Sequence, residues 1–322
     1  MSPSFQLALY RAAARLARYA PLPAKAAASL AGRRAATEQW QAWSRAKRES
    51  GRRVWVHAAS VGEAVTAEPV VRRLLVAEPG LTPIYTHASP TIAGWPHAFG
   101  AAAVAYAPPE EPTATAAVFD ALHPAMLVFS RGDLWPELLI AAHARSIPVA
   151  VLGGTIRPRS RRLAWPARSF FRRLLRPVRF VGAVTRGDAA RWIASGVPAS
   201  AVSVTGDPRH DYVIERTTEV SRLRPLLAWA TPGTLVAGSV EEDDEGLVLG
   251  AFALVRGGHA EARLVIVPHE PAPAVVERVR ERAGRLGVAA ETWAEGRRPE
   301  ADCVVVQPRG LLADLYLVEG LK

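Results

Sequence analysis

The chain has 322 residues, 49% of them hydrophobic, which is enough for two domains with cores of their own. Its formal net charge of +10 favours acidic partners such as nucleic acid, anionic lipid, or phosphorylated and carboxylated substrates. Cys303 is the only cysteine, which excludes an internal disulfide framework and a thiolate metal cluster.

The N-terminal residues are predicted to form an amphipathic helix. Phe5, Leu9, Ala12, Leu16 and Tyr19 recur at helical spacing, and three arginines interrupt the stretch, which argues against a secretory signal. Such a helix suits a membrane interface or a groove of its own domain, and the sequence favours neither. Because no run of 18 apolar residues occurs, a membrane-spanning helix is not expected.

From Val54 onward, short β-branched runs alternate with helical patterns, which indicates parallel sheets covered on both faces. Two doubly wound α/β domains are expected, facing each other across a cleft, with ligand sites at the carboxyl ends of the strands. The predicted hinge is Gly206–Leu223. The predicted strands are Val54–Ala58, Thr82–Thr86, Ala102–Tyr106, Met126–Ser130, Pro148–Leu152, Phe180–Thr185, Val202–Thr205, Thr234–Gly238, Arg263–Val267 and Cys303–Val306.

Several common signatures are absent from the sequence. There is no phosphate loop of the form G-x-x-x-x-G-K-[ST], no G-x-G-x-x-G turn and no H-E-x-x-H zinc motif. The eight histidines show no ligand spacing, so no metal site is expected.

The first candidate for chemistry is the segment from His57 to Glu63, after the first strand of the main domain. Ser60 and Glu63 have the spacing of a capping box, which would satisfy free amide groups at a helix start. Alternatively, Gly62 lets a ligand approach the backbone, and Glu63 is a general base at a strand end. Spacing alone favours the capping interpretation.

The second candidate, Ser130–Pro136, also begins at a strand end. Pro136 suits the first turn of a helix, and Trp135 is explained by packing in the core. The charged residues Arg131 and Asp133 beside a glycine are less easily explained by packing, although a surface turn accounts for them equally well.

The third candidate is the run Arg157–Arg179, where nine arginines alternate with Trp165, Phe170 and Phe171. Basic residues among aromatic ones suit an interface that carries phosphate groups, whether a membrane or RNA. A solvated helix face is the simpler interpretation, but this density of positive charge is unusual without an anionic partner.

Three further segments each follow a predicted strand. Gly206–Asp211 by itself is a turn, Gly238–Glu245 is a strand end leading into an acidic helix start, and Pro268–Glu270 follows a strand. The acidic start is explained by the helix dipole, with Ser239 as its N-cap.

Taken in order, these segments resemble one family, the Kdo (3-deoxy-D-manno-octulosonic acid) transferases of lipopolysaccharide assembly. Each motif is weak singly, but their collinear order from Val54 onward is specific. The matching segments are Ser60–Glu63 (SVGE), Thr86–Thr91 (TSPTG), Gly132–Pro136 (ETELWP), Arg157–Ser160 (NARLSERS), Gly206–Asp211 (GNLKFD), Gly238–Glu245 (GSTxxxEE) and Pro268–Glu270 (PRHPER).

The resemblance implies a GT-B-like fold and transfer of Kdo from CMP-Kdo to a lipid A precursor, with inversion, no metal, and no other cofactor. Glu63 would be the general base, and Arg209 would match a lysine that stabilises the transition state. Asp133, or the position of Arg131, would match an acidic residue with a similar role. The remaining implied contacts are to the donor nucleotide (Ser239, Pro268, His269, Glu270, Arg309, Gly310 and Leu311) and to the acceptor (Ser60, Gly62, Ser89, Thr91, Arg157, Ser160 and Asp211).

The sequence departs from the family pattern at several positions. Arg131 stands where a Glu is expected, His269 replaces the usual Arg, and Leu311 replaces a Glu. The family continues beyond Lys322 with a further nucleotide site, so the second domain is expected to be truncated and the chain itself to be inactive.

The predicted organisation is therefore a membrane-associating segment (1–40), an acceptor-binding domain (41–212) and an incomplete nucleotide-sugar domain (213–322). The expected location is the cytoplasmic face of a bacterial inner membrane, at an anionic lipid surface and without nucleic acid. Two alternatives remain: a nucleotide-sugar transferase or epimerase with another substrate, and a non-catalytic module that binds RNA or membrane.

Overall fold

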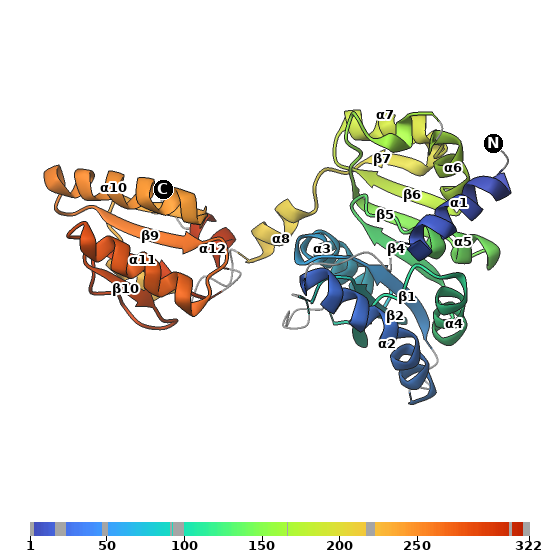
Figure 1. The fold of residues 1–322 in the computed structure, drawn as a ribbon, viewed down its shortest axis with the longest axis horizontal. Coiled ribbons are helices and arrows are strands. Elements are labelled where there is room, and N and C mark those ends of the chain that lie inside the picture. Colours follow the sequence, from blue (N-terminus) through green and yellow to red (C-terminus); the bar gives the residue numbers. More distant parts are fainter. Residues whose placement is uncertain are drawn as a thin grey trace. The chain divides into compact units, whose positions relative to one another are not determined.

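A computed structural model describes residues 3–16, 24–46, 51–90, 92, 100–165, 167–216, 223–308 and 311–317. Residue contacts divide the chain into two units, Met1–Tyr212 and Val213–Lys322. They are called the N-terminal and the C-terminal unit below, and each is built around a parallel sheet of its own (Figure 1).

The N-terminal unit contains a seven-stranded sheet with the order β3-β2-β1-β4-β5-β6-β7. All neighbouring strands are parallel. The chain winds outward from β1 in one direction and then from β4 in the other, so the order of the strands reverses between β1 and β4. The strands are β1 (Arg52–His57), β2 (Leu81–His87), β3 (Ala103–Tyr106), β4 (Met126–Ser130), β5 (Val149–Gly154), β6 (Val178–Ala183) and β7 (Val202–Val204).

Both faces of this sheet are buried, as expected for near-continuous apolar strands. Trp55 in β1 packs into a core on one face, whereas its neighbours Val54 and Val56 pack into a second core on the other face. Helix α3 (Val61–Ala77) covers the second core. The first core is covered by helices α2 (Ala24–Ala46), α4 (Pro112–Leu122), α5 (Pro136–Ala144), α6 (Ala167–Leu174) and α7 (Arg186–Ser195). Short 3-10 turns, η3 (Arg161–Leu163) and η4 (Ala199–Ala201), precede α6 and β7.

The first helix, α1 (Pro3–Leu16), docks on its own unit through polar side chains. Arg11 forms a bidentate ion pair with the buried Glu137, with distances of 2.7 and 3.0 Å. Gln6 donates to the Ser169 hydroxyl at 2.8 Å, and the ring of Tyr10 lies 5.8 Å from that of Phe170. The predicted helix is confirmed up to Leu16, and Tyr19 lies outside the described residues.

The C-terminal unit has a four-stranded parallel sheet with the order β10-β11-β9-β8. Alternate residues of its strands again face two cores, one under α9 and α12 and the other under α10 and α11. The strand at Ala290–Trp293 was not predicted. The elements are α8 (Arg209–Arg216), which spans the division, α9 (Arg224–Trp229), β8 (Thr234–Val240), α10 (Glu242–Gly258), β9 (Arg263–Pro268), α11 (Pro273–Arg285), β10 (Ala290–Trp293), β11 (Cys303–Val306) and α12 (Leu312–Leu317).

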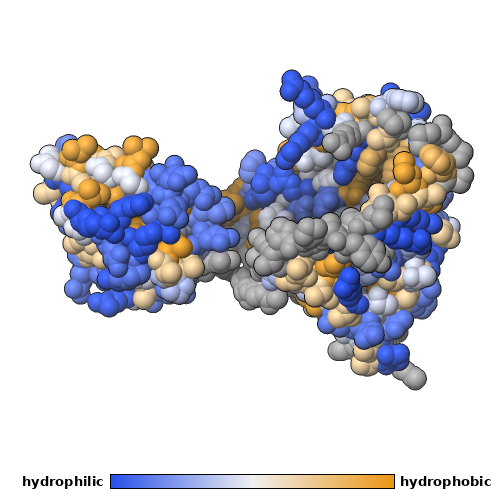
Figure 2. Space-filling view, in the orientation of Figure 1, coloured by the Kyte–Doolittle hydropathy of each residue, from blue (hydrophilic) through white to orange (hydrophobic). Residues whose placement is uncertain are grey.

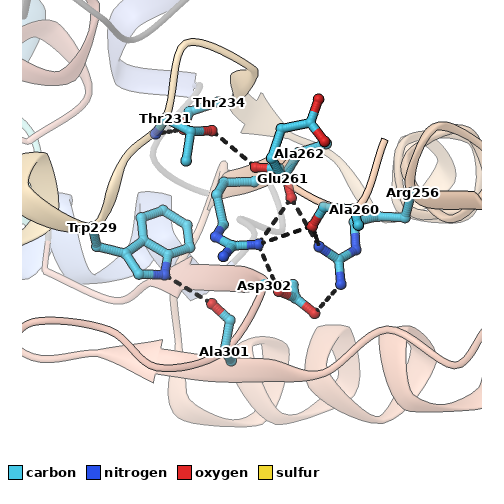
Figure 3. Close-up of polar contacts among 10 residues, drawn as sticks. Trp229, Thr231, Thr234, Arg256, Ala260, Glu261, Ala262, Ala301 and Asp302 are labelled. Atoms are coloured by element: carbon cyan, nitrogen blue, oxygen red, sulfur yellow. Dashed lines mark hydrogen bonds and ion pairs between the residues drawn. The ribbon is translucent and has the colours of Figure 1, made fainter. Parts of the chain in front are cut away.

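A polar cluster holds the amino end of this second sheet together (Figure 3). Asp302 accepts hydrogen bonds from Arg256 at 2.5 Å and from Arg263 at 2.7 Å. The indole nitrogen of Trp229 donates to the carbonyl oxygen of Ala301 at 3.0 Å, and Thr231 donates to that of Glu261 at 2.9 Å. These bonds join α10 to β9, β11 and the segment before β8, so the cluster is structural.

Hydrophobic residues also lie on the surface of this unit, over α10 in Figure 2, where Leu247 and Leu254 are among the most exposed large hydrophobic side chains. In the parts of the chain that the structure describes, no helix combines the length and the apolar character needed to cross a bilayer.

Candidate active site

Two of the predicted catalytic residues, Glu63 and Asp133, lie where the strand order reverses. Glu63 follows β1 and Asp133 follows β4, and these two strands are adjacent in the sheet. Open parallel α/β sheets bind their ligands beyond the carboxyl ends of the strands at this switch point. The topology therefore places both carboxyl groups at the preferred ligand position of this fold.

Glu63 lies in the first turn of α3 and is half-buried. Burial and, to a lesser extent, the nearby charge of Asp133 raise the pKa of its carboxyl group to about 7, against the opposing effect of hydrogen bonds from Ala59 and Ser60. The backbone N–H of Ser60 donates to Oε2 of Glu63 at 3.1 Å, so the capping contact is present. The cap orients the carboxylate without neutralising it, and the two interpretations of this motif are compatible.

The side chain of Trp135 holds Asp133 in place. The indole nitrogen of Trp135 donates to Oδ2 of Asp133 at 3.1 Å. The guanidinium of Arg33 lies 4.0 Å above the Trp135 ring, and the ring of His57 lies 4.6 Å from it. Burial lowers the pKa of His57 to about 3, so this imidazole is neutral. Trp135 is therefore both a core residue and a support for Asp133.

The backbone turn that joins β4 to Asp133 is tight. Arg131 has a positive φ of 61°, which is costly for a residue with a side chain and is typical of functional sites. A Cβ atom on Gly132 would lie 2.5 Å from the carbonyl oxygen of Thr155, so only glycine fits at this position. The backbone N–H of Arg131 donates to Leu152 at 2.7 Å, which joins the turn to β5.

The segment after β7 contributes Arg209 and Asp211. Asp207 accepts from Arg209 at distances of 2.6 to 3.1 Å, and this pairing lowers the pKa of Asp207 against the opposing effect of burial. The positive charge of Arg131 acts in the same direction. Asp211 lies 3.7 Å from Arg73 of α3, so this segment rests near the helix that carries Glu63.

The predicted acceptor residues are dispersed around this edge of the sheet. Ser60 is exposed, and a Cβ atom on Gly62 would meet nothing within 4 Å, so crowding does not require that glycine. The backbone N–H of Ser89 donates to Ala59 at 3.0 Å, which places it beside the helix start. Arg157 is exposed, and its carbonyl accepts from the Ser160 N–H at 2.9 Å; Thr91 lies outside the described residues.

In the C-terminal unit, two predicted donor residues meet. The hydroxyl of Ser239 lies 2.8 Å from Nδ1 of His269, and Ser239 has a positive φ of 57° at the irregular end of β8. Pro268 ends β9, and Glu270 is exposed beyond it. Leu311 is buried in the core with Leu315. Arg309 and Gly310 lie outside the described residues.

Several residues of the site were not identified from the sequence. Ser130 begins a predicted candidate segment, but its contact with Glu63 was not predicted, and Arg33 carries no sequence signal, because the contacts of both join segments far apart in the chain. Asp207 had a weak signal, its spacing of two residues from Arg209 within a turn. Among the described residues, no group of three or more His, Cys, Asp or Glu side chains is arranged to hold a metal ion.

Comparison with known proteins identifies the family. Residues 15–212 match the model of the 3-deoxy-D-manno-octulosonic-acid transferase (kdotransferase) family. The 3-deoxy-D-manno-octulosonic acid transferase of Bordetella pertussis is 30% identical over 254 residues, which cover 75% of this chain and 56% of that protein. The Haemophilus influenzae protein of the same name is 24% identical, with coverage of 68% and 52%. The chain thus spans little more than half the length of these relatives.

Solved structures support the fold. The UDP-GlcNAc 2-epimerase of Neisseria meningitidis superimposes with a TM-score of 0.56 at 14% identity, over 82% of this chain and 74% of that one. That of Methanocaldococcus jannaschii gives 0.57 at 12% identity, over 84% and 77%. These GT-B-like neighbours confirm the predicted α/β fold class, and the match of residues 15–212 shows that this chain belongs to the 3-deoxy-D-manno-octulosonic-acid transferase family.

Proposed function

We propose that the protein acts in lipopolysaccharide assembly as a glycosyltransferase that moves Kdo from CMP-Kdo to a lipid A precursor, with inversion at the anomeric carbon. In this reaction a hydroxyl of the acceptor attacks the anomeric carbon, its proton passes to Glu63, and the bond to the phosphate of CMP breaks. The N-terminal unit would hold the acceptor, and the C-terminal unit would supply contacts to the donor.

The observation that carries the proposal is the position and pKa of Glu63. A general base works best when its pKa is near the operating pH. Burial and the charge of Asp133 raise the pKa of Glu63 to about 7. Glu63 lies at the switch point where this fold binds ligands. Ordinary exposed carboxyl groups are far weaker bases, so a raised pKa at this place is the property that the proposed step requires.

The arginines at the same edge of the sheet have the charge that the leaving phosphate needs. Asp207 fixes the guanidinium of Arg209, and Arg131 is held by the strained turn after β4. Fixed positive groups stabilise charge that develops in the transition state. We therefore propose Arg131 and Arg209 as stabilising residues and a reaction that needs no divalent metal. Unchanged transfer in the presence of EDTA supports this, whereas loss that is restored by Mg²⁺ contradicts it.

Ser239 and His269 are proposed to contact the donor nucleotide in the C-terminal unit. Ser239 lies near the carboxyl end of β8 and His269 follows β9, and Ser239 has a positive φ of 57°, a backbone conformation that clusters at functional sites. Replacing His269 with Ala should weaken CMP binding, measured by calorimetric titration, with His259→Ala as the exposed control.

The test of the activity is Kdo transfer from CMP-Kdo to a lipid A precursor by the purified protein. Glu63→Gln should keep the fold and lower transfer by roughly 10²–10⁴-fold, because the amide cannot accept the proton. Glu78→Gln, at the exposed end of the same helix, is the matched control. The absence of transfer by the unsubstituted protein contradicts the activity, and near-normal transfer by Glu63→Gln leaves Glu63 only a capping role.

We also propose that the protein binds the anionic cytoplasmic face of the inner membrane through α1 and α6. Polar contacts fix α1 on its unit, while Phe5 and Leu9 remain 56% and 55% exposed and Trp165, before α6, is 87% exposed. A cavity of about 490 Å³ beside Trp165 is lined by four arginines of the α6 region, Arg168, Arg172, Arg173 and Arg176. Exposed apolar side chains beside arginines suit a lipid interface better than a nucleic acid groove.

A further inference from the structure

We infer that Arg162 binds an anionic group of the substrate, a phosphate or a carboxylate, beside the Gly132–Asp133 turn. This inference rests on the proposed function in one respect, which is that the site holds an acidic sugar. No motif of the sequence distinguishes Arg162 from the other arginines of its run, and only its place in the fold does so.

Arg162 lies in η3, which follows β5, and it reaches back to the turn after β4. Its Nη1 atom is 3.7 Å from the point where a Cβ atom on Gly132 would lie. The guanidinium packs over the ring of Phe171 in α6, 5.3 Å from the ring centroid. The aromatic contact and the glycine together hold this cation beside the switch point, two residues from the predicted acceptor residue Ser160.

The side chain of Arg162 is partly buried and packs on Phe171, and no carboxylate among the described residues forms an ion pair with it. Burial lowers the pKa of Arg162, and the charge of Asp133 only partly offsets this effect. Within the parts of the chain that the structure describes, the guanidinium takes part in no hydrogen bond or ion pair; only the backbone N–H of Arg162 is bonded, to the Ser160 hydroxyl at 3.4 Å. Asp133 therefore acts on it from beyond ion-pair distance.

Two other partly buried arginines of this unit are paired with carboxylates. Arg11 is paired with Glu137, and Arg191 with Asp188, each at 2.7 Å. A buried charge without a partner is unfavourable, and it persists when a ligand completes its interactions. The planar guanidinium suits phosphate and carboxylate groups, because it can donate two parallel hydrogen bonds to either.

The test measures binding of small probes without any transfer reaction. Glucose 1-phosphate, glucuronate and glucose are titrated into the protein, and the Arg162 side-chain N–H signal is followed by NMR. The signal is assigned by its loss in Arg162→Gln. Saturable binding of either acidic probe but not of glucose is expected, and the two acidic probes distinguish a phosphate from a carboxylate. Absence of binding, or equal binding of glucose, overturns the inference.

Paired variants separate an anion site from a structural contact. Arg162→Gln should weaken binding of the acidic probe by roughly 10–100-fold, and Arg162→Lys by less, because lysine keeps the charge but loses the planar fork. Asp133→Asn should tighten binding, because it removes a repelling carboxylate. Arg34→Gln, an exposed arginine on α2, is the control for loss of charge and should bind normally.

Each outcome bears on the inference. If Arg162→Gln folds, by circular dichroism, and binds the probe as tightly as the unsubstituted protein, the inference is wrong. If Arg162→Gln does not fold, the inference is tested with Arg162→Lys and Asp133→Asn. Weaker probe binding by Arg162→Lys and tighter probe binding by Asp133→Asn support the site, and unchanged binding by both variants refutes it. Because the binding assay involves no transfer reaction, failure of the proposed transfer does not affect its result.

Discussion

The hydroxyl of Ser130, at the end of β4, donates a 2.6 Å hydrogen bond to the backbone carbonyl oxygen of Glu63. Ser130 is buried, and the two residues are 67 positions apart in the chain. The bond joins the turn that carries Asp133 to the first turn of α3, so the separation of the two carboxyl groups depends on it. Burial is the largest cause of the raised pKa of Glu63, and the second cause, the charge of Asp133, depends on that separation.

Replacing Ser130 with Ala should destabilise the N-terminal unit and misplace Glu63. Loss of a buried hydrogen bond of this kind lowers the free energy of unfolding by about 1 kcal/mol. Urea denaturation measures this, with Ser203→Ala, at an exposed position of β7, as the control that should change little. An unchanged midpoint and an unchanged Glu63 pKa in Ser130→Ala would show that the bond does not position the site.

The Glu63 carboxyl group should titrate near pH 7, well above its ordinary value of 4.5. Its proton is lost as the pH rises through 7, so transfer should increase with pH over this range. Carbon-13 NMR of the carboxyl group measures the pKa directly. Asp133→Asn should lower it, because Asp133 is the second cause of the shift; a pKa near 4.5 in the unsubstituted protein contradicts the assignment.

The raised pKa of Glu63 also makes the stability of the N-terminal unit depend on pH. Between about pH 4.5 and 7 the folded state keeps the Glu63 proton while the unfolded chain releases it, so this group makes the unit less stable as the pH rises through that window. Glu63→Gln removes this contribution and should therefore stabilise the unit more at pH 8 than at pH 4. Thermal unfolding at both values tests this, and a difference of the opposite sign refutes it.

Arg131→Gly should stabilise the N-terminal unit, because glycine adopts the positive φ of 61° without strain. The expected gain is about 0.5–1 kcal/mol in the free energy of unfolding, measured by urea denaturation. Arg145→Gly, whose φ is negative, is the control and should destabilise. If Arg131→Gly also lowers transfer, the strained backbone of Arg131 is retained for function. If Arg131→Gly instead destabilises the unit, the backbone of Arg131 is not strained.

Membrane binding should depend on the surface of α1 and α6. In flotation assays the protein should bind vesicles with anionic lipid more than neutral ones, and Trp165→Ala and Arg172→Gln should each weaken binding, by about 1 kcal/mol for the arginine. Leu247→Ser, on the exposed face of α10, is the matched control for loss of an exposed apolar side chain. Equal binding to both kinds of vesicle, or equal loss with Leu247→Ser, argues against the proposed surface.

Most strand positions could be predicted from the sequence, because apolar β-branched runs between turn residues report local preference and burial together. The predicted strands Met126–Ser130 and Cys303–Val306 match the structure residue for residue. The strand Ala290–Trp293 was missed because it lies at a sheet edge, where only Trp293 is buried and the apolar pattern is weak. The placement of Glu63 and Asp133 at strand ends could likewise be predicted from the chain.

Which strand ends are neighbours could not be predicted from local sequence and is seen in the fold alone. The strand order puts β1 beside β4, and this brings Glu63 and Asp133 together although 70 positions separate them. The fold likewise brings together Arg33 and Trp135, Ser130 and Glu63, and Arg162 and Phe171. Local sequence patterns record the preferences of neighbouring residues, whereas burial, charge and pKa at this site arise from side chains that the fold brings together from distant segments.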